Sequence, residues 1–94
     1  MKPTEDRYVR RYVDVEVTFD AAGRMRPRAI LWTDGNRYEI DRVTDVRPAH
    51  AEKSGGQGDR YRIKVHGHDR ELFFEHNPEF GAVSVGRWFL QCKL

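Results

Sequence analysis

The histidines of this chain come nearest to the spacing of a metal site. His66 and His68 flank Gly67, and alternate residues of a strand share a face, where two imidazoles could hold one ion. Further ligands would have to come from His76, Cys92 or an acid that the fold brings near. Because His68 falls in a predicted turn and His66 ends a predicted strand, the two rings need not converge. We therefore predict no metal site.

Cys92, the single cysteine, invites comparison with a catalytic nucleophile. Such a role requires a thiolate that a neighbouring base or cation stabilises. Cys92 instead alternates with Trp88 and Leu90, which indicates a small buried apolar side chain. No base, nucleophile and orienting residue can be assembled elsewhere in the chain, so we predict that the protein is not an enzyme.

A glycine-rich stretch from Lys53 to Gly58 holds the ingredients of an anion-binding nest, in which backbone N–H groups surround a phosphate. Its order differs from a P-loop, because lysine and serine precede the glycines and no strand and helix frame them. The lack of periodicity over residues 47–59 predicts a mobile surface loop, and weak anion binding stays open. No cofactor is predicted.

Arginines that alternate with apolar and aromatic residues give the strongest functional signal. Small β-barrels bind single-stranded nucleic acid with such surfaces, because bases stack on aromatic rings while cations follow the phosphates. Two tyrosines and two arginines between Tyr8 and Tyr12 lie just upstream. The predicted binding surface comprises Arg24, Arg26, Arg28, Ile30, Trp32, Arg37 and Arg62.

Two functions fit this surface. The favoured one is a non-catalytic protein-interaction or binding module, acting through an open sheet edge or an exposed patch of Ile30 and Trp32. Single-stranded nucleic-acid binding is the alternative. The nucleic-acid hypothesis is weakened because neighbouring acids are expected to neutralise the cations. Arg28, for example, is predicted to face Asp41.

The composition limits both functions. With 94 residues the chain forms one domain with one modest core, and residues 1–7 are expected to be flexible. The net charge of +2 arises from 17 basic and 15 acidic residues in the same segments, which indicates a mixed surface without a strong long-range field. No apolar run is long enough for a membrane span or a signal peptide, and the single cysteine excludes an intrachain disulfide. We therefore expect a cytoplasmic protein.

The clearest single strand runs from Val13 to Phe19, where apolar and polar residues alternate without interruption. Val13, Val15, Val17 and Phe19 should face the core. Residues 5–12 form either an extension of this strand or a short helix, and the extension is favoured.

A hairpin is predicted next in the chain. Asp20 to Gly23 form a turn, and a strand follows from about Met25 to Thr33. The dipeptide Asp34-Gly35 favours a type I′ turn. The facing pairs in that register are Leu31–Tyr38, Ala29–Ile40, Arg28–Asp41 and Trp32–Arg37, the last a cation–π pair.

The hairpin from Arg60 to Glu75 is the strongest structural signal in the chain. With Gly67 and His68 as a two-residue turn, opposite charges face each other on one side and apolar residues on the other. The facing pairs are Lys64–Glu71, Arg60–Glu75, Ile63–Leu72 and Tyr61–Phe74. Only Arg62, opposite Phe73, is left without a charge facing it.

A final strand from Arg87 to Lys93 follows a turn-rich connection over residues 76–81. Six short strands with tight connections predict an all-β fold, a single small antiparallel meander or barrel of SH3-like or similar type with no long helix. The last strand could close the barrel by pairing with the first, which removes exposed edges. Alternatively, an open edge pairs with a second copy of the chain.

Hairpin and core residues also carry a family resemblance. They are Pro27, Ile30-Leu31-Trp32, Gly35, Tyr38, Ile40-Asp41, Val43, Arg60-Tyr61, Leu72-Phe73-Phe74-Glu75 and Arg87-Trp88-Phe89, with a glycine-rich loop before Arg60. Over roughly residues 25–92 the chain resembles small β-rich bacterial proteins of unknown function. The resemblance implies a bacterial cytosolic β-domain and transfers no catalytic residue.

Overall fold

All regular secondary structure in the described residues is β-strand. The computed structural model describes residues 7–51, 56–76 and 86–93, so the predictions for residues 1–7 and 76–81 fall almost wholly outside it. Within these ranges no helix occurs, and the strands are β1 (Tyr8–Phe19), β2 (Met25–Leu31), β3 (Arg37–Glu39), β4 (Arg42–Ala51), β5 (Gly56–Val65), β6 (His68–Glu75) and β7 (Arg87–Lys93). The all-β prediction is confirmed. The described residues contain no helix that could cross a membrane.

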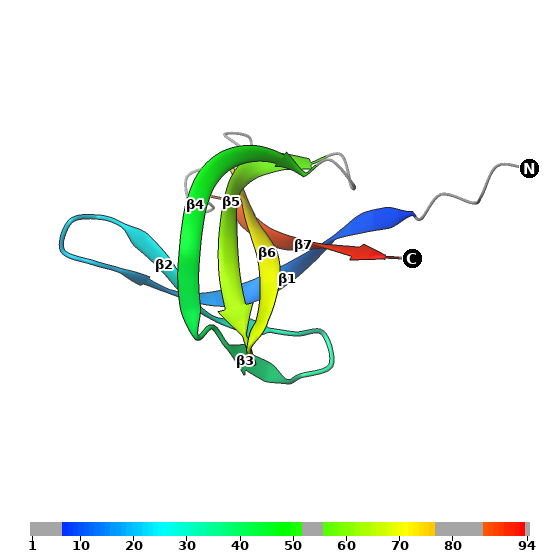
Figure 1. Cartoon of the computed structure of the whole chain (residues 1–94), viewed down its shortest axis with the longest axis horizontal. Coiled ribbons are helices and arrows are strands. Elements are labelled where there is room, and N and C mark those ends of the chain that lie inside the picture. The colour runs from blue at the N-terminus through cyan, green and yellow to red at the C-terminus, as the bar shows by residue number, and fades with distance from the viewer. Residues whose placement is uncertain (1–6, 52–55, 77–85, 94) are drawn as a thin grey trace, which may run out of the picture.

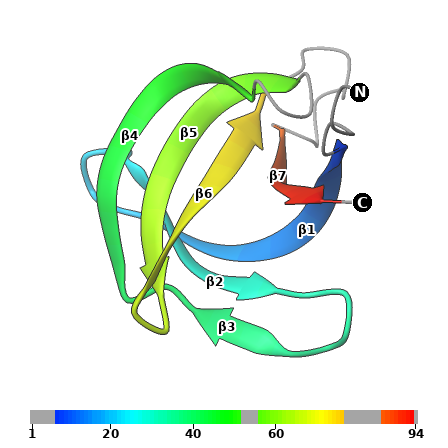
Figure 2. The same ribbon diagram turned by 45° about the vertical axis from the view of Figure 1, so that its right-hand side comes forward.

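The strands form one antiparallel sheet in the order β3-β2-β1-β7-β6-β5-β4. β1 pairs with β7, from Tyr8 opposite Lys93 to Val13 opposite Trp88, as predicted, but this pairing does not close the described sheet into a barrel. This pair lies in the middle of the sheet and leaves β3 and β4 at the two edges. The sheet curls into a half-barrel (Figure 1 and Figure 2).

The strand β1 is long enough to pair with two different strands along its two halves. Tyr8–Val13 pair with β7, and Asp14–Phe19 pair with β2. A bulge between Glu16 and Val17 shifts the register within the second half, and bulges of this kind increase the local bend and twist of a strand. The predicted extension of this strand upstream of Val13 is therefore confirmed as far as Tyr8.

The inner face of the half-barrel carries the main core. Its buried side chains are Ile30, Tyr61, Ile63, Leu72, Phe74 and Trp88, and the half-buried Val13 and Val15 pack against them. Val17 and Phe19, which were predicted to join this core, are 36% and 63% exposed. This prediction is wrong because the end of β1 pairs with β2 alone, and no third strand covers it in the described sheet.

A second, smaller apolar cluster lies on the outer face of the central strands. Phe73 and Phe89 are 1% and 0% exposed, and their rings stack with centroids 5.1 Å apart and planes 8° apart. Tyr12 packs edge-on against Phe89 at 5.6 Å. Since Phe73 and Phe89 alternate with core residues, β6 and β7 are apolar on both faces at the centre of the sheet.

The β5–β6 hairpin has a different register from the predicted one. Its turn is His66-Gly67, with φ angles of 52° and 76°, and a type I′ turn requires positive φ at both central residues. The observed pairs are Lys64–Asp69, Arg62–Glu71, Tyr61–Leu72 and Arg60–Phe73. The pairing has moved by two residues, and because side chains alternate with a period of two, each residue keeps its predicted face. The apolar face is confirmed, whereas the predicted charge pairs are wrong.

The β2–β3 hairpin turns through three residues, the last of them Gly35 with a φ of 88°, instead of the predicted two. Trp32 and Asn36 close the turn, and the N–H of Trp32 donates to the carbonyl of Asn36 at 2.9 Å. The observed pairs are Ile30–Tyr38, Ala29–Glu39 and Leu31–Arg37. A shift of one residue changes which side chains share a face, so Arg37 no longer faces Trp32 and the predicted cation–π pair is wrong.

The segment predicted as an irregular loop, residues 47–59, is strand wherever it is described. β4 continues to Ala51 and β5 begins at Gly56, and the two strands pair up to these residues. Pro48 is tolerated because β4 is an edge strand, where a missing N–H breaks no ladder on the open side. β4 is the strand that the predicted count of six omitted.

Gly58 in β5 is a glycine for a steric reason. A β-carbon at this position would collide with the backbone carbonyl of Phe74 on β6. We predict that Gly58→Ala lowers the free energy of unfolding by about 1–3 kcal/mol, because the two strands must separate to accept the methyl group. Chemical denaturation monitored by circular dichroism measures the loss.

Gly23→Asn is the matched control. Gly23 has a φ of 80° and no atom within 4 Å of its β-carbon position, and asparagine tolerates this backbone conformation. The control should cost less than about 1 kcal/mol. Equal losses for the two variants would contradict the steric explanation.

Candidate functional site

The residues of the predicted binding surface do not form one surface. Ile30 is only 5% exposed and belongs to the inner core. Arg37 lies on the outer face, where its guanidinium donates two hydrogen bonds to the Glu16 carboxylate at 2.9 and 3.1 Å. Arg62 lies on the outer face of β5, with its Nε 3.8 Å from a carboxylate oxygen of Glu71. Neither Arg37 nor Arg62 lines a groove together with the other residues of the predicted surface.

The Arg37–Glu16 pair has a structural role. It joins β3 to β1 across β2, where Ala29 faces both Glu16 and Glu39 and is 0% exposed. A small residue at position 29 lets the two long side chains meet above it. The hydrogen bonds from Arg37 lower the pKa of Glu16, so the pair stays ionised at neutral pH.

Arg24, Arg26 and Arg28 line a groove of about 660 Å³ between β2 and β4, and Arg42 joins them from the β4 side. The groove also has an apolar part, to which Met25, Pro27, Val43, Val46 and Tyr61 contribute. Arg42, Val43 and Val46 were missed in the sequence because a bulge between Val43 and Asp45 interrupts the alternation that would have marked β4.

Only part of the positive charge in this groove is neutralised. Asp20 binds Arg24, with Nε and Oδ2 2.9 Å apart, and the same oxygen lies 3.7 Å from Arg26. The backbone N–H of Arg24, followed by the side chain of Arg24 and the N–H of Ala22, lowers the pKa of Asp20 against the opposing effect of burial. Arg28 and Arg42 make no ion pair within the described part of the chain, so the predicted Arg28–Asp41 pair is not formed.

The same groove lies between two strand edges. β3 pairs only with Ala29–Leu31, so β2 has no described partner on that side along Met25–Pro27. β4 ends the sheet, and its outer edge has no described partner strand either. We call this region, the groove with the edges Met25–Pro27 and Val43–Pro48, the open seam. Unpaired edges present backbone donors and acceptors to any strand that approaches.

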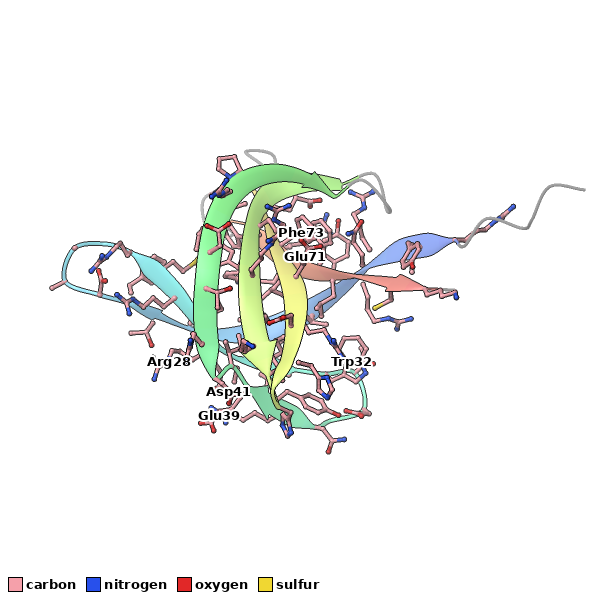
Figure 3. The ribbon with its side chains drawn as sticks, viewed as in Figure 1. Arg28, Trp32, Glu39, Asp41, Glu71 and Phe73 are labelled. Atoms are coloured by element: carbon pink, nitrogen blue, oxygen red, sulfur yellow. The ribbon has the colours of Figure 1, made fainter. Side chains whose placement is uncertain are left out.

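A second groove lies at the other end of β2, on the inner face. It has a volume of about 390 Å³ and includes Trp32, Tyr38, His66, His68 and Arg70 among its lining residues, over Ile30 and Leu90. We call it the aromatic cleft. Figure 3 shows Arg28 to the left and Trp32 to the right of the β4–β6 strands, so the predicted basic and aromatic residues are divided between the two grooves.

The His66-Gly67-His68 pattern lies at the aromatic cleft. His66, His68 and Cys92 all line the aromatic cleft. They do not converge, because the described residues contain no group of three or more His, Cys, Asp or Glu side chains arranged to hold a metal ion. His66 instead contacts Tyr38 edge-on, with ring centroids 5.9 Å apart.

A polar cluster that the sequence did not indicate surrounds Glu75. Glu75, predicted to face Arg60, is only 12% exposed and accepts hydrogen bonds from Tyr12 at 2.9 Å, Arg87 at 2.9 Å and Arg10 at 3.3 Å. The Arg87 guanidinium also lies 4.0 Å from the centre of the Tyr12 ring. We call this group the Glu75 cluster. It joins β1, β6 and β7 on the outer face.

The Glu75 cluster has the charges of a structural contact and not those of a catalytic site, because its carboxylate is held ionised by neighbouring donors. Burial alone would raise the pKa of Glu75, but the hydrogen bonds from Arg87 and Tyr12 and the charges of Arg87 and Arg10 outweigh it, so this pKa is lowered. Burial, with the bond to Glu75, raises the pKa of Tyr12. A carboxylate held ionised by three donors is a poor general base, and a neutral tyrosine is a poor nucleophile.

Comparison of the chain with protein-family models, with curated proteins and with solved structures gives no match. The chemistry of the two grooves is therefore the basis for assigning a function.

We predict that Glu75→Gln lowers the free energy of unfolding by about 1.5–3 kcal/mol at pH 7, because two arginines lose their shared anion. The pKa of Glu75 is lower in the folded protein, so its contribution is complete above the ordinary value of 4.5 and is lost as the pH falls through the folded value. The difference between the two proteins should thus shrink below about pH 4. Urea denaturation from pH 7 to pH 3 measures it.

Glu39→Gln is the matched control, since the Glu39 side chain is 75% exposed and lies 3.8 Å from its cationic partner Arg37. It should change stability by less than about 0.5 kcal/mol at any pH. A loss in Glu75→Gln that stays constant down to pH 3 would contradict the assignment of this carboxylate as the titrating group.

Proposed function

We propose that the protein is a non-catalytic protein-interaction module, and that its partner is an acidic segment in extended conformation which adds to the sheet at the open seam. One observation carries the proposal: a single groove of about 660 Å³ is bounded by the Met25–Pro27 edge of β2 and the outer edge of β4, neither of which has a partner among the described strands. An extended peptide could bind either edge with backbone hydrogen bonds, as in other cases of strand addition.

The side chains of the seam suit such a partner. Val46, which lines the groove, is 49% exposed. Beside the groove on β1, Val17 and Phe19, opposite Pro27 and Met25 in the register, are 36% and 63% exposed. Alternate apolar residues of an added strand would cover this surface, and each square ångström of apolar area removed from water contributes about 25 cal/mol. Exposed apolar residues beside arginines are typical of protein interfaces.

The charge of the seam selects an acidic partner. Four arginines line the groove, and Asp20 and Asp41 are the acids that lie in it or bind its arginines. Arg28 and Arg42 keep their charge without an ion-pair partner in the described residues. Carboxylates on the outward-facing positions of an added strand would neutralise them, which also speeds association.

Single-stranded nucleic acid is the weaker candidate for the seam. Such ligands need aromatic rings on which bases stack next to the cations that bind phosphates. The aromatic residue that lines the groove is Tyr61, which is 7% exposed, whereas the exposed Phe19 on β1 is not part of the groove lining and Trp32 lies in the other groove. An oligonucleotide is nevertheless included as a competitor in the test below.

A labelled nine-residue peptide of alternating glutamate and valine is the probe. We predict saturable binding by fluorescence anisotropy, and at least a tenfold weaker affinity for the double variant Arg28→Glu with Arg42→Glu. A peptide of alternating glutamine and valine should bind weakly, because it lacks the charge. Amides on the outer edge of β4 should become protected from hydrogen exchange when the acidic peptide is added.

Arg47→Glu is the matched control. The backbone of Arg47 belongs to the β4 edge of the seam, but Arg47 follows Val46, so its side chain points to the other face and does not line the groove. Its Nε lies 3.0 Å from a carboxylate oxygen of Asp45. This variant should bind the peptide with less than a threefold change in affinity. Absence of peptide binding, or equal loss in the control, would refute the seam as the site, and salt-sensitive binding of the oligonucleotide alone would favour the nucleic-acid candidate.

A further inference from the structure

The aromatic cleft is separate from the open seam. The two grooves share no lining residue, and they lie at the two ends of β2. We propose that the aromatic cleft is a second binding site, for a small planar aromatic ring that carries a negative charge. The proposal does not depend on what binds the seam.

The size and the walls of the cleft fit such a molecule. A volume of about 390 Å³ lies within the range of small-molecule pockets, roughly 300–1,000 Å³. Residues from β2, β3, β5, β6, β7 and the His66-Gly67 turn meet here, so the site is built from five strands of the same sheet. Convergence of this kind positions groups more firmly than a single loop does.

The aromatic rings give the cleft its preference for a flat ligand. Tyr38 faces Ile30 in the register, and Trp32 lies two residues beyond Ile30, so both rings are on the inner face of one hairpin. His66 contacts the Tyr38 ring from the opposite hairpin at 5.9 Å between centroids. Trp32 is only half-buried, so part of its ring remains available for stacking.

The charges that line the cleft itself favour anions, while Asp69 and Glu71 line an adjoining groove that shares Arg70 with it. Its described lining contains no aspartate or glutamate, and its ionisable groups include Arg70, His66 and His68. One Nη of Arg70 donates to the backbone carbonyl of Asp69 at 2.9 Å, which leaves its other guanidinium donors for a ligand. The Arg11 guanidinium lies 5.9 Å from the centre of the Trp32 ring and adds a further cation at the same place.

A nucleotide and an aromatic carboxylate share this chemistry, and four probes separate the possibilities. Adenosine monophosphate carries ring and charge, and 2-naphthoate carries a ring with a carboxylate. Adenosine carries the ring alone, and ribose 5-phosphate carries the charge alone. Each is titrated into the ¹⁵N-labelled protein, with the indole N–H signal of Trp32 and the backbone signals of the cleft followed by NMR.

We expect adenosine monophosphate, 2-naphthoate or both to bind at least tenfold more tightly than adenosine and ribose 5-phosphate. Binding of adenosine monophosphate but not 2-naphthoate identifies a nucleotide site. Binding of 2-naphthoate but not adenosine monophosphate identifies a site for aromatic carboxylates. The proposal is overturned if neither adenosine monophosphate nor 2-naphthoate causes a saturable shift in the cleft. It is also overturned if adenosine or ribose 5-phosphate binds as tightly as these charged aromatic probes.

Variants locate the site. Arg70→Gln and Trp32→Ala should each weaken binding of the charged aromatic probe at least fivefold. If Trp32→Ala fails to fold, Trp32→Leu and Arg70→Gln still test the ring and the charge separately. Arg62→Gln and Phe19→Ala are matched controls, because they remove an exposed cation and an exposed ring outside the cleft.

The double variant Arg28→Glu with Arg42→Glu distinguishes this proposal from the proposed function. It should leave binding in the cleft unchanged while it abolishes peptide binding at the seam. If Arg70→Gln and Trp32→Ala bind the aromatic probe as the unmodified protein does, the cleft is not the site, whatever the seam binds.

Discussion

The architecture depends on the sharing of β1 between two partners. Its first half pairs with β7 and its second half with β2, so the strand links the β2–β3 hairpin to the β4–β7 part of the sheet. The Glu75 cluster and the Tyr12, Phe73 and Phe89 rings hold β1, β7 and β6 together on the outer face. Because this junction closes the middle of the sheet, the free edges fall on β3 and β4. The open seam is a consequence of that order.

Both grooves then follow from curvature. A sheet that curls without closing leaves its inner face accessible at the places where neighbouring strands diverge. β2 lies at this boundary, with the seam at its first residues and the aromatic cleft just beyond its last residue. The apolar centre between them is filled by Ile30, Tyr61 and Trp88, which separates the two sites. One strand therefore contributes to two chemically different surfaces.

Composition and alternation predicted the fold class and most strands correctly. The prediction failed for hairpin registers and bulges, which depend on the conformation of single residues. The all-β fold follows from local patterns, and the pairing of the first and last strands follows from the cost of exposed edges. The error of two residues at His66-Gly67 left every face unchanged, whereas the error of one residue at Gly35 exchanged partners across the hairpin. The bulges near Val17 and Thr44, and the glycines of β5, have no signal that distinguishes them from loop residues.

The arginines show why the candidate site could be predicted only in part. Thirteen arginines look equivalent in the sequence, but the register gives Arg10, Arg37 and Arg87 carboxylate partners that fix the sheet. Arg28 and Arg42 have no carboxylate partner among the described residues, and they line the same groove from separate strands. A cation already bound to a carboxylate gains little from a new anion, because the new contact must replace the old one. The charge that the proposed function uses is therefore the small remainder left unpaired after folding, and it depends on pairings that no single segment of the sequence contains.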